Sequence, residues 1–173
     1  MIAQYLTIDF PEFVEKLVLA VTLARPNDTV KERCETWIKS AEDKDYEAII
    51  KDSALYSYSD EYLRKNKMML NVISKIGAPK SFDRFITFSK ACTTHNAYEK
   101  LEKITCPTLV IGGKQDKIVT YEASEEIASK IPNAKLKTYE KFGHALYEEG
   151  KDFNKTVYDF CCGDETLLEK IDK

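Results

Sequence analysis

An aspartate and a histidine each follow an expected strand toward the C-terminal end of the sequence. The uncharged run TLVI at 108–111 ends at two glycines and leads into a loop with Asp116, and the run at 136–139 leads into a loop with His144. A hydroxyl is a poor nucleophile at neutral pH, and a neutral imidazole with a pKa of about 6.5 can take its proton. We therefore predict His144 as a general base and Asp116 as the carboxylate that orients and stabilises its ring.

The second histidine and the cysteines have less distinctive positions. His95 is expected to be a cap or connection residue at the surface rather than a substrate contact. The cysteines are odd in number and show no C-x-x-C spacing, which argues against a disulfide framework and against a zinc site. They are Cys34, Cys92, Cys106, Cys161 and Cys162. A reducing cytoplasm is the simplest location for such a chain.

Composition excludes several classes of function. The 173 residues are 43% hydrophobic and 32% charged, which is typical of one globular domain with a modest core. The net charge of −3, without a basic stripe, gives no reason to expect nucleic acid as a partner. The start of the sequence lacks a basic segment before an apolar run, so no secretion signal is predicted. The uncharged run 17–24 is far too short to cross a membrane.

The elements expected around the two loops are of mixed α/β type. A helix is expected over 2–8 and is broken at Phe10-Pro11, because proline lacks the amide donor. The consecutive apolar residues at 16–22 (KLVLAVT) predict a strand buried on both faces, as in parallel sheets. An amphipathic helix is expected over 121–131, and a last helix over 153–160.

The middle of the sequence has a different character. Three or so helices are expected from Thr29 to about Lys75, followed by a break at 77–79 and a further helical stretch. Aromatic and methionine residues here could wall an apolar pocket, although their helical spacing favours packing between helices. The residues concerned are Trp37, Met68, Met69, Phe82, Phe85 and Phe88.

Two stretches of the sequence carry a resemblance to a known family. The segments MIAQYLTIDFPEFVEKLVLAV at 1–21 and KITCPTLVIGGKQD at 103–116 resemble the C-terminal half of the α/β-hydrolase superfamily. In that family the triad partners follow in the order Ser, Asp or Glu, His, and the Ser stands on a sharp G-x-S-x-G turn. The middle, roughly 25–102, matches only by position, at the place where the family commonly inserts a variable helical cap.

The family order also decides between candidate acids. Asp152 and Asp159 both follow His144 in the chain, so the order disfavours them relative to Asp116. Thr120 stands where family members often have Pro after the acid loop, and we expect it to cap the next helix instead.

No serine of the sequence matches the nucleophile turn. None has Gly two places before and two places after it, and the same holds for Cys92 and Cys106. The serines are Ser40, Ser53, Ser57, Ser59, Ser74, Ser81, Ser89, Ser124 and Ser129. By the resemblance, Met1 falls where the residue just after the G-x-S-x-G turn is expected. The nucleophile and the oxyanion donors are therefore expected upstream, and the chain alone is expected to be inactive.

The resemblance implies a truncated α/β-hydrolase fold, with about three parallel strands, flanking helices and an inserted helical cap. The expected division is 1–24 as core helix and strand, 25–102 as helical cap, 103–163 as C-terminal core and 164–173 as polar tail. The implied activity is serine-type hydrolysis of an ester, lactone or similar small carbonyl substrate, without a metal or organic cofactor.

An alternative function remains open from the sequence. The chain could be a non-catalytic remnant, or a subunit that binds a partner supplying the N-terminal half. In either case the strand at 16–22 would lack a neighbour on one side, and an open apolar edge of this kind favours self-association.

Overall fold

Three parallel strands form one sheet in the order β1–β2–β3 within residues 1–163, which are the residues that the computed structural model describes. The strands are β1 (Leu17–Ala20), β2 (Thr108–Gly113) and β3 (Ala134–Tyr139). In register, Thr108 lies opposite Leu17 on one side and Ala134 on the other. The predicted parallel α/β arrangement of about three strands with flanking helices is confirmed.

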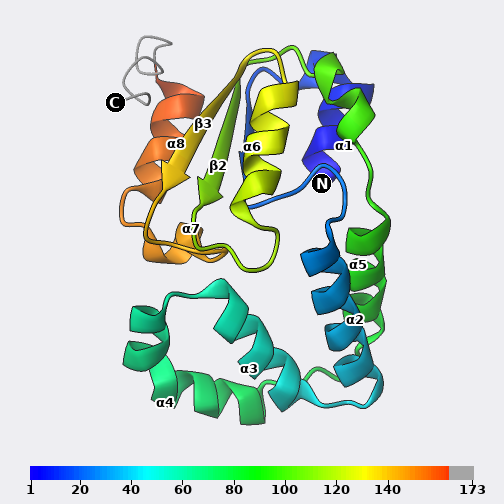
Figure 1. Cartoon of the computed structure of the whole chain (residues 1–173), viewed down its shortest axis with the longest axis vertical. Coiled ribbons are helices and arrows are strands. Elements are labelled where there is room, and N and C mark those ends of the chain that lie inside the picture. Colours follow the sequence, from blue (N-terminus) through cyan, green and yellow to red (C-terminus); the bar gives the residue numbers. More distant parts are fainter. Residues whose placement is uncertain (164–173) are drawn as a thin grey trace.

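Four α-helices lie between β1 and β2 in the chain: α2 (Asp28–Glu42), α3 (Tyr46–Ser57), α4 (Asp60–Ile76) and α5 (Asp83–Thr94). Side-chain oxygens of Asn27, Asp45 and Ser59 accept from the first free amides of α2, α3 and α4 and so fix where these helices begin. In Figure 1, α2 and α5 run side by side, and α3 and α4 form a layer that faces the arrowheads of the sheet.

The remaining elements pack around the sheet. They are α1 (Ile2–Asp9), η1 (Pro11–Phe13), η2 (Tyr98–Lys103), α6 (Tyr121–Lys130), α7 (Leu146–Glu149) and α8 (Phe153–Cys162). The helices expected over 2–8, 121–131 and 153–160 are therefore present. The single turn α7 was not predicted, because four residues carry no helical periodicity. The polar tail expected at 164–173 lies outside the described residues.

One expectation about a helix start is wrong. Thr120 stands at the N-cap position of α6, but its side chain accepts no hydrogen bond from the first turn. Its φ of 65° places it in the left-handed region, where the side chain does not have the geometry of a normal cap.

The core lies on both faces of the central strand. Every residue of β2 is buried, which explains its uninterrupted apolar sequence. On one face Val110 packs in a cluster with Leu101 and Ile127, and on the other Ile111 packs in a cluster with Leu146. All five side chains are fully buried, so β2 is the rigid element from which the next loop projects.

The loops after β2 and β3 approach each other so closely that one position must be glycine. A Cβ on Gly113 would lie 2.4 Å from the carbonyl oxygen of Phe142 and 2.7 Å from that of Gly143. The two loops are also joined by backbone hydrogen bonds. The amide of Lys114 donates to the carbonyl of Tyr139 at 3.0 Å, and the amide of Gln115 donates to the carbonyl of Phe142 at 3.1 Å. Residues far apart in sequence are thereby held together at the carboxyl ends of the strands.

We predict that Gly113→Ala destabilises the protein by about 1–3 kcal/mol, because the obstructing atoms are backbone carbonyls that cannot rotate away. Gly77→Ala is the matched control. Its added methyl group would meet mainly the hydroxyl end of the Tyr46 side chain, which can move. Urea unfolding of both variants measures the difference, and equal losses would contradict the proposed constraint at Gly113.

Candidate active site

The predicted acid is a buried carboxylate held by its own loop. The Asp116 side chain is 1% exposed. Its Oδ1 accepts hydrogen bonds from the backbone amides of Ile118 at 2.8 Å and Val119 at 3.0 Å, and its own amide donates to the carbonyl of Gly113. These bonds leave Oδ2 as the atom that is available to a partner in the neighbouring loop.

The predicted base is that partner. Nδ1 of His144 lies 3.0 Å from Oδ2 of Asp116. Because an ionised carboxylate can only accept, Nδ1 carries the proton in this pair, and the lone pair of the neutral ring is on Nε2. The structure thus brings together the two residues that the sequence singled out.

A cavity of about 330 Å³ lies against His144. Most of its wall is apolar and comes from the strand-end loops and from α2 and α5. Its lining residues are Met1, Val21, Thr22, Leu23, Val30, Cys34, Trp37, Ser57, Cys92, Ile118, Val119 and His144. An apolar cavity with one imidazole at its wall suits a small, largely uncharged ligand.

Strained backbone contributes to this wall. Val21 has a φ of 42°, which is rare for a β-branched residue, and its amide donates to the carbonyl of Ile111 at 2.9 Å. The turn ends β1 and directs Thr22 and Leu23 along the cavity. Such strain is often concentrated at functional sites.

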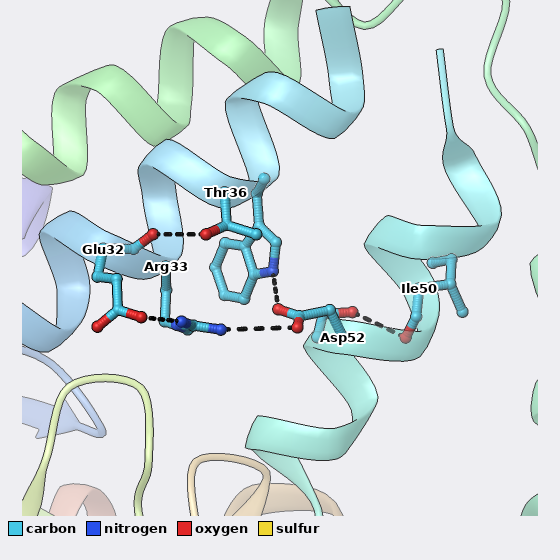
Figure 2. A network of polar contacts seen from close by, with 7 residues as sticks. Glu32, Arg33, Thr36, Ile50 and Asp52 are labelled. Atoms are coloured by element: carbon cyan, nitrogen blue, oxygen red, sulfur yellow. Dashed lines mark hydrogen bonds and ion pairs between the residues drawn. The ribbon is translucent and has the colours of Figure 1, made fainter. Parts of the chain in front are cut away.

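Trp37 is fixed in the cavity wall by a polar network between α2 and α3 (Figure 2). Its indole nitrogen donates to Oδ2 of Asp52 at 2.7 Å. The guanidinium of Arg33 lies 3.6 Å from the other oxygen of Asp52 and stacks 4.4 Å from the ring centroid of Tyr56. Figure 2 shows Asp52 on α3 facing Arg33 on α2, so this carboxylate positions two side chains of the neighbouring helix.

The loop with His144 is also tied to the helical layer. The amide of Ala145 donates to the carbonyl of Ser57 at 2.9 Å, at the end of α3. In the next residue after Ser57, the hydroxyl of Tyr58 donates to Glu148 at 2.7 Å, and Ser59 then donates through both its amide and its hydroxyl to Glu149. The turn between α3 and α4 is therefore hydrogen-bonded to α7 next to the imidazole.

Other candidates lie elsewhere. His95 is the C-cap residue of α5, as expected of a connection residue, and its Nε2 lies 2.8 Å from Oε1 of the buried Gln4. Burial lowers the pKa of His95. Asp152 stands at the N-cap position of α8, and Asp159 pairs with Lys155 at 2.5 Å.

The aromatic and methionine residues of the middle segment have different surroundings. Trp37 lines the cavity, and Phe82 and Phe85 are half-buried. The other three are exposed: Met68 at 81%, Met69 at 43% and Phe88 at 62%. For these three, the expectation of helix packing was wrong, and none lines the cavity. They lie on helices whose periodicity indicates a face but not what covers it.

Three residues that shape the site, two of them in the cavity wall, were not identified as such from the sequence. Cys34 and Cys92 line the same wall, but their spacing carries no local signal. Asn27 caps α2 and donates from Nδ2 to the carbonyl of Val119 at 2.8 Å, so it also holds the acid loop. An Asn directly before Asp-Thr and a helical run is an N-cap pattern, and it could have indicated the first of these roles.

Within residues 1–163, no cluster of three or more His, Cys, Asp and Glu side chains is arranged to bind a metal. No helix in this part of the chain is long and apolar enough to span a membrane. Among the serines, Ser57 lines the cavity, and the described residues include no hydrogen bond between its hydroxyl and His144.

Comparisons with curated proteins find hydrolases. The chain is 27% identical over 162 residues to the "Putative carbamate hydrolase RutD" of Caulobacter sp. (strain K31), covering 92% of this chain and 60% of that protein. It is 30% identical over 111 residues to the 2-hydroxy-6-oxononadienedioate/2-hydroxy-6-oxononatrienedioate hydrolase of Cupriavidus pinatubonensis (strain JMP 134 / LMG 1197), covering 63% of this chain and 34% of that protein. The chain thus spans less than two thirds of the length of each of these relatives.

Solved structures give the same fold. MGS-M2, an alpha/beta hydrolase enzyme from a Medee basin deep-sea metagenome library, superposes with a TM-score of 0.85 at 23% identity, covering 92% of this chain and 60% of that one. The enol-lactonase from Burkholderia xenovorans LB400 superposes with a TM-score of 0.80 at 20% identity and the same coverage. The model of the alpha/beta hydrolase fold family matches residues 1–151. This match spans most of the chain, which therefore belongs to the alpha/beta hydrolase fold family.

Proposed function

We propose that this chain provides the acid and the base of a serine-type hydrolase that cleaves an ester, lactone or similar small carbonyl substrate. The observation that carries the proposal is the 3.0 Å bond between Nδ1 of His144 and Oδ2 of Asp116 at the wall of an apolar cavity. The relatives support the class of reaction, because they include a protein named as a carbamate hydrolase and an enol-lactonase.

The arrangement provides the proton transfers that this reaction needs. Nε2 of His144 takes the proton of an attacking hydroxyl and later returns it to the leaving group. Asp116 keeps the ring in one orientation and stabilises the imidazolium that forms, and the amides of Ile118 and Val119 in turn hold its carboxylate. The apolar cavity walls exclude water around these charges and strengthen their interaction.

In this proposal, a segment outside residues 1–173 provides the nucleophile and the oxyanion donors. No serine of this sequence has the G-x-S-x-G pattern, and the relatives are longer than this chain. The helices α2–α5 act as the cap that shapes the substrate pocket, as supported by the contribution of Trp37 and Val30 to the cavity wall.

We predict that the 173-residue chain alone does not turn over p-nitrophenyl esters of short acids beyond a slight background. An imidazole without an aligned serine and an oxyanion hole lacks the groups that supply most of the acceleration. Stopped-flow kinetics and labelling with a serine-directed phosphonate test this. A burst of product together with stoichiometric phosphonate labelling would place a nucleophile within the chain and overturn that part of the proposal.

When a G-x-S-x-G-bearing segment is fused to the chain or expressed with it, His144→Ala and Asp116→Asn should each lower kcat by about 10³-fold or more. His95→Ala is the matched histidine control, because that ring contacts Gln4 outside the cavity. The kcat of His95→Ala should stay within about threefold of the kcat of the complemented enzyme without this substitution. For comparison, a tenfold change in kcat corresponds to about 1.4 kcal/mol of activation free energy. Full activity of His144→Ala in the complemented enzyme would remove the basis of the assignment.

A second candidate function is a subunit that binds a partner supplying the N-terminal half, and a specific surface favours it. On β1, the amides of Leu17 and Val21 donate toward β2, so those of Val18 and Ala20 face the open side of the sheet. Beside this edge, α1, η1 and the residue between them expose apolar side chains: Ile2 at 86%, Leu6 at 47%, Phe10 at 51% and Phe13 at 75%. An open strand edge with an apolar border is suited to strand or helix pairing.

We predict that the isolated chain self-associates through this surface, and that Phe13→Asp weakens the association by adding a charge to its border. Light scattering measures the mass, and hydrogen exchange reports on the amides of 17–21, of which Val18 and Ala20 should exchange fastest. A monodisperse monomer with strongly protected Val18 and Ala20 amides would show that the edge is satisfied within the chain.

A further inference from the structure

Two cysteines from different helices meet at the cavity wall. Cys34 lies on α2 and Cys92 on α5, the pair of helices that run side by side in Figure 1. Both line the cavity that His144 borders. The exposed thiols of Cys161 and Cys162 lie at the end of α8, on a different part of the molecule.

The two cysteines have different environments. Cys34 is buried, and the half-buried Cys92 packs against the apolar cluster that contains it. The neighbouring thiol of Cys92, together with burial, raises the pKa of Cys34. The neighbouring thiol of Cys34 lowers the pKa of Cys92 to about 7, and the N-terminal ammonium and His144 act in the same direction. Cys92 is therefore both the more accessible thiol and the one that ionises more readily.

We propose that Cys34 and Cys92 form a reversible oxidation site, in which Cys92 reacts with a hydroperoxide that enters the cavity and Cys34 then closes a disulfide with it. A reactive thiol in a cavity with a neighbouring thiol to resolve it is the arrangement typical of thiol redox sites. The proposal requires no turnover by the hydrolase site and is independent of the function proposed above.

The hydroperoxide is the only oxidant that this reaction needs. The Cys92 thiolate attacks the terminal oxygen, the O–O bond breaks, the alcohol or water leaves with a proton, and Cys92 becomes a sulfenic acid. The Cys34 sulfur then attacks the Cys92 sulfur, the S–O bond breaks and water leaves with the Cys34 proton. The two thiols are oxidised by two electrons in total, and the hydroperoxide is reduced by the same two electrons.

A disulfide at this position links α2 to α5 covalently. Its geometry requires the two Cα atoms to lie about 4.4–6.8 Å apart. The bond would lie in the cavity wall that His144 also borders, so it would fix the two helices that form this wall. A small dithiol reverses the change by thiol–disulfide exchange.

The test uses the 173-residue chain with hydrogen peroxide as the oxidant. After limited oxidation, peptide mapping under non-reducing conditions should show a Cys34–Cys92 cross-linked peptide, with the loss of two titratable thiols. The fluorescence of Trp37, the single tryptophan of the sequence, should fall as the disulfide forms beside it and recover with dithiothreitol. At pH 7, iodoacetamide should modify Cys92 at least about threefold faster than Cys161, because the lowered pKa of Cys92 gives it a large thiolate fraction at this pH.

Variants separate the two roles. In Cys34→Ser the reaction should stop at the Cys92 sulfenic acid, which dimedone traps, whereas Cys161→Ser should still form the disulfide. If Cys34→Ser fails to fold, the peptide map of the unaltered chain still decides. Oxidation confined to Cys161 and Cys162, or a Cys92 that reacts no faster than Cys161, would overturn the proposal.

Discussion

The buried carboxylate of Asp116 is the constraint on which the site depends. A charge removed from water costs several kcal/mol unless hydrogen bonds and a partner compensate. Here two amides of the same loop and one imidazole of the next loop satisfy it. The requirement explains why the loops after β2 and β3 lie in contact and why Gly113 occupies the crossing point. It also fixes the orientation of the imidazole toward the cavity.

The helices between β1 and β2 add the rest of the cavity through one face of α2. Val30, Cys34 and Trp37 are spaced by four and then three residues, so they lie along one stripe of the helix, and all three line the cavity. Arg33 lies at the edge of the same stripe, three residues after Val30 and four before Trp37, and reaches Asp52 on α3. A single helix thus provides the cavity wall and the contact that holds its neighbour.

The sequence predicted those features that depend on local pattern. The uninterrupted TLVI run indicated a fully buried strand, and β2 is buried throughout. The order of strand, loop and charged residue was enough to pair Asp116 with His144, because parallel strands end at one edge of a sheet. Contacts between helices were not predictable in this way. Nothing in the spacing of Cys34 and Cys92 indicates that α2 packs on α5, and nothing near Phe88 indicates that it is exposed. Thr120 shows the same limit for backbone geometry, because its residue type suggested a cap and its φ prevents one.

The hydrogen bond between Ala145 and Ser57 has a mechanical consequence. Ser57 belongs both to the end of α3 and to the cavity wall, and Ala145 directly follows the imidazole. A displacement of the end of α3 is therefore transmitted through one backbone hydrogen bond to the residue beside the imidazole, so the position of the helical layer and the alignment of His144 with Asp116 are linked.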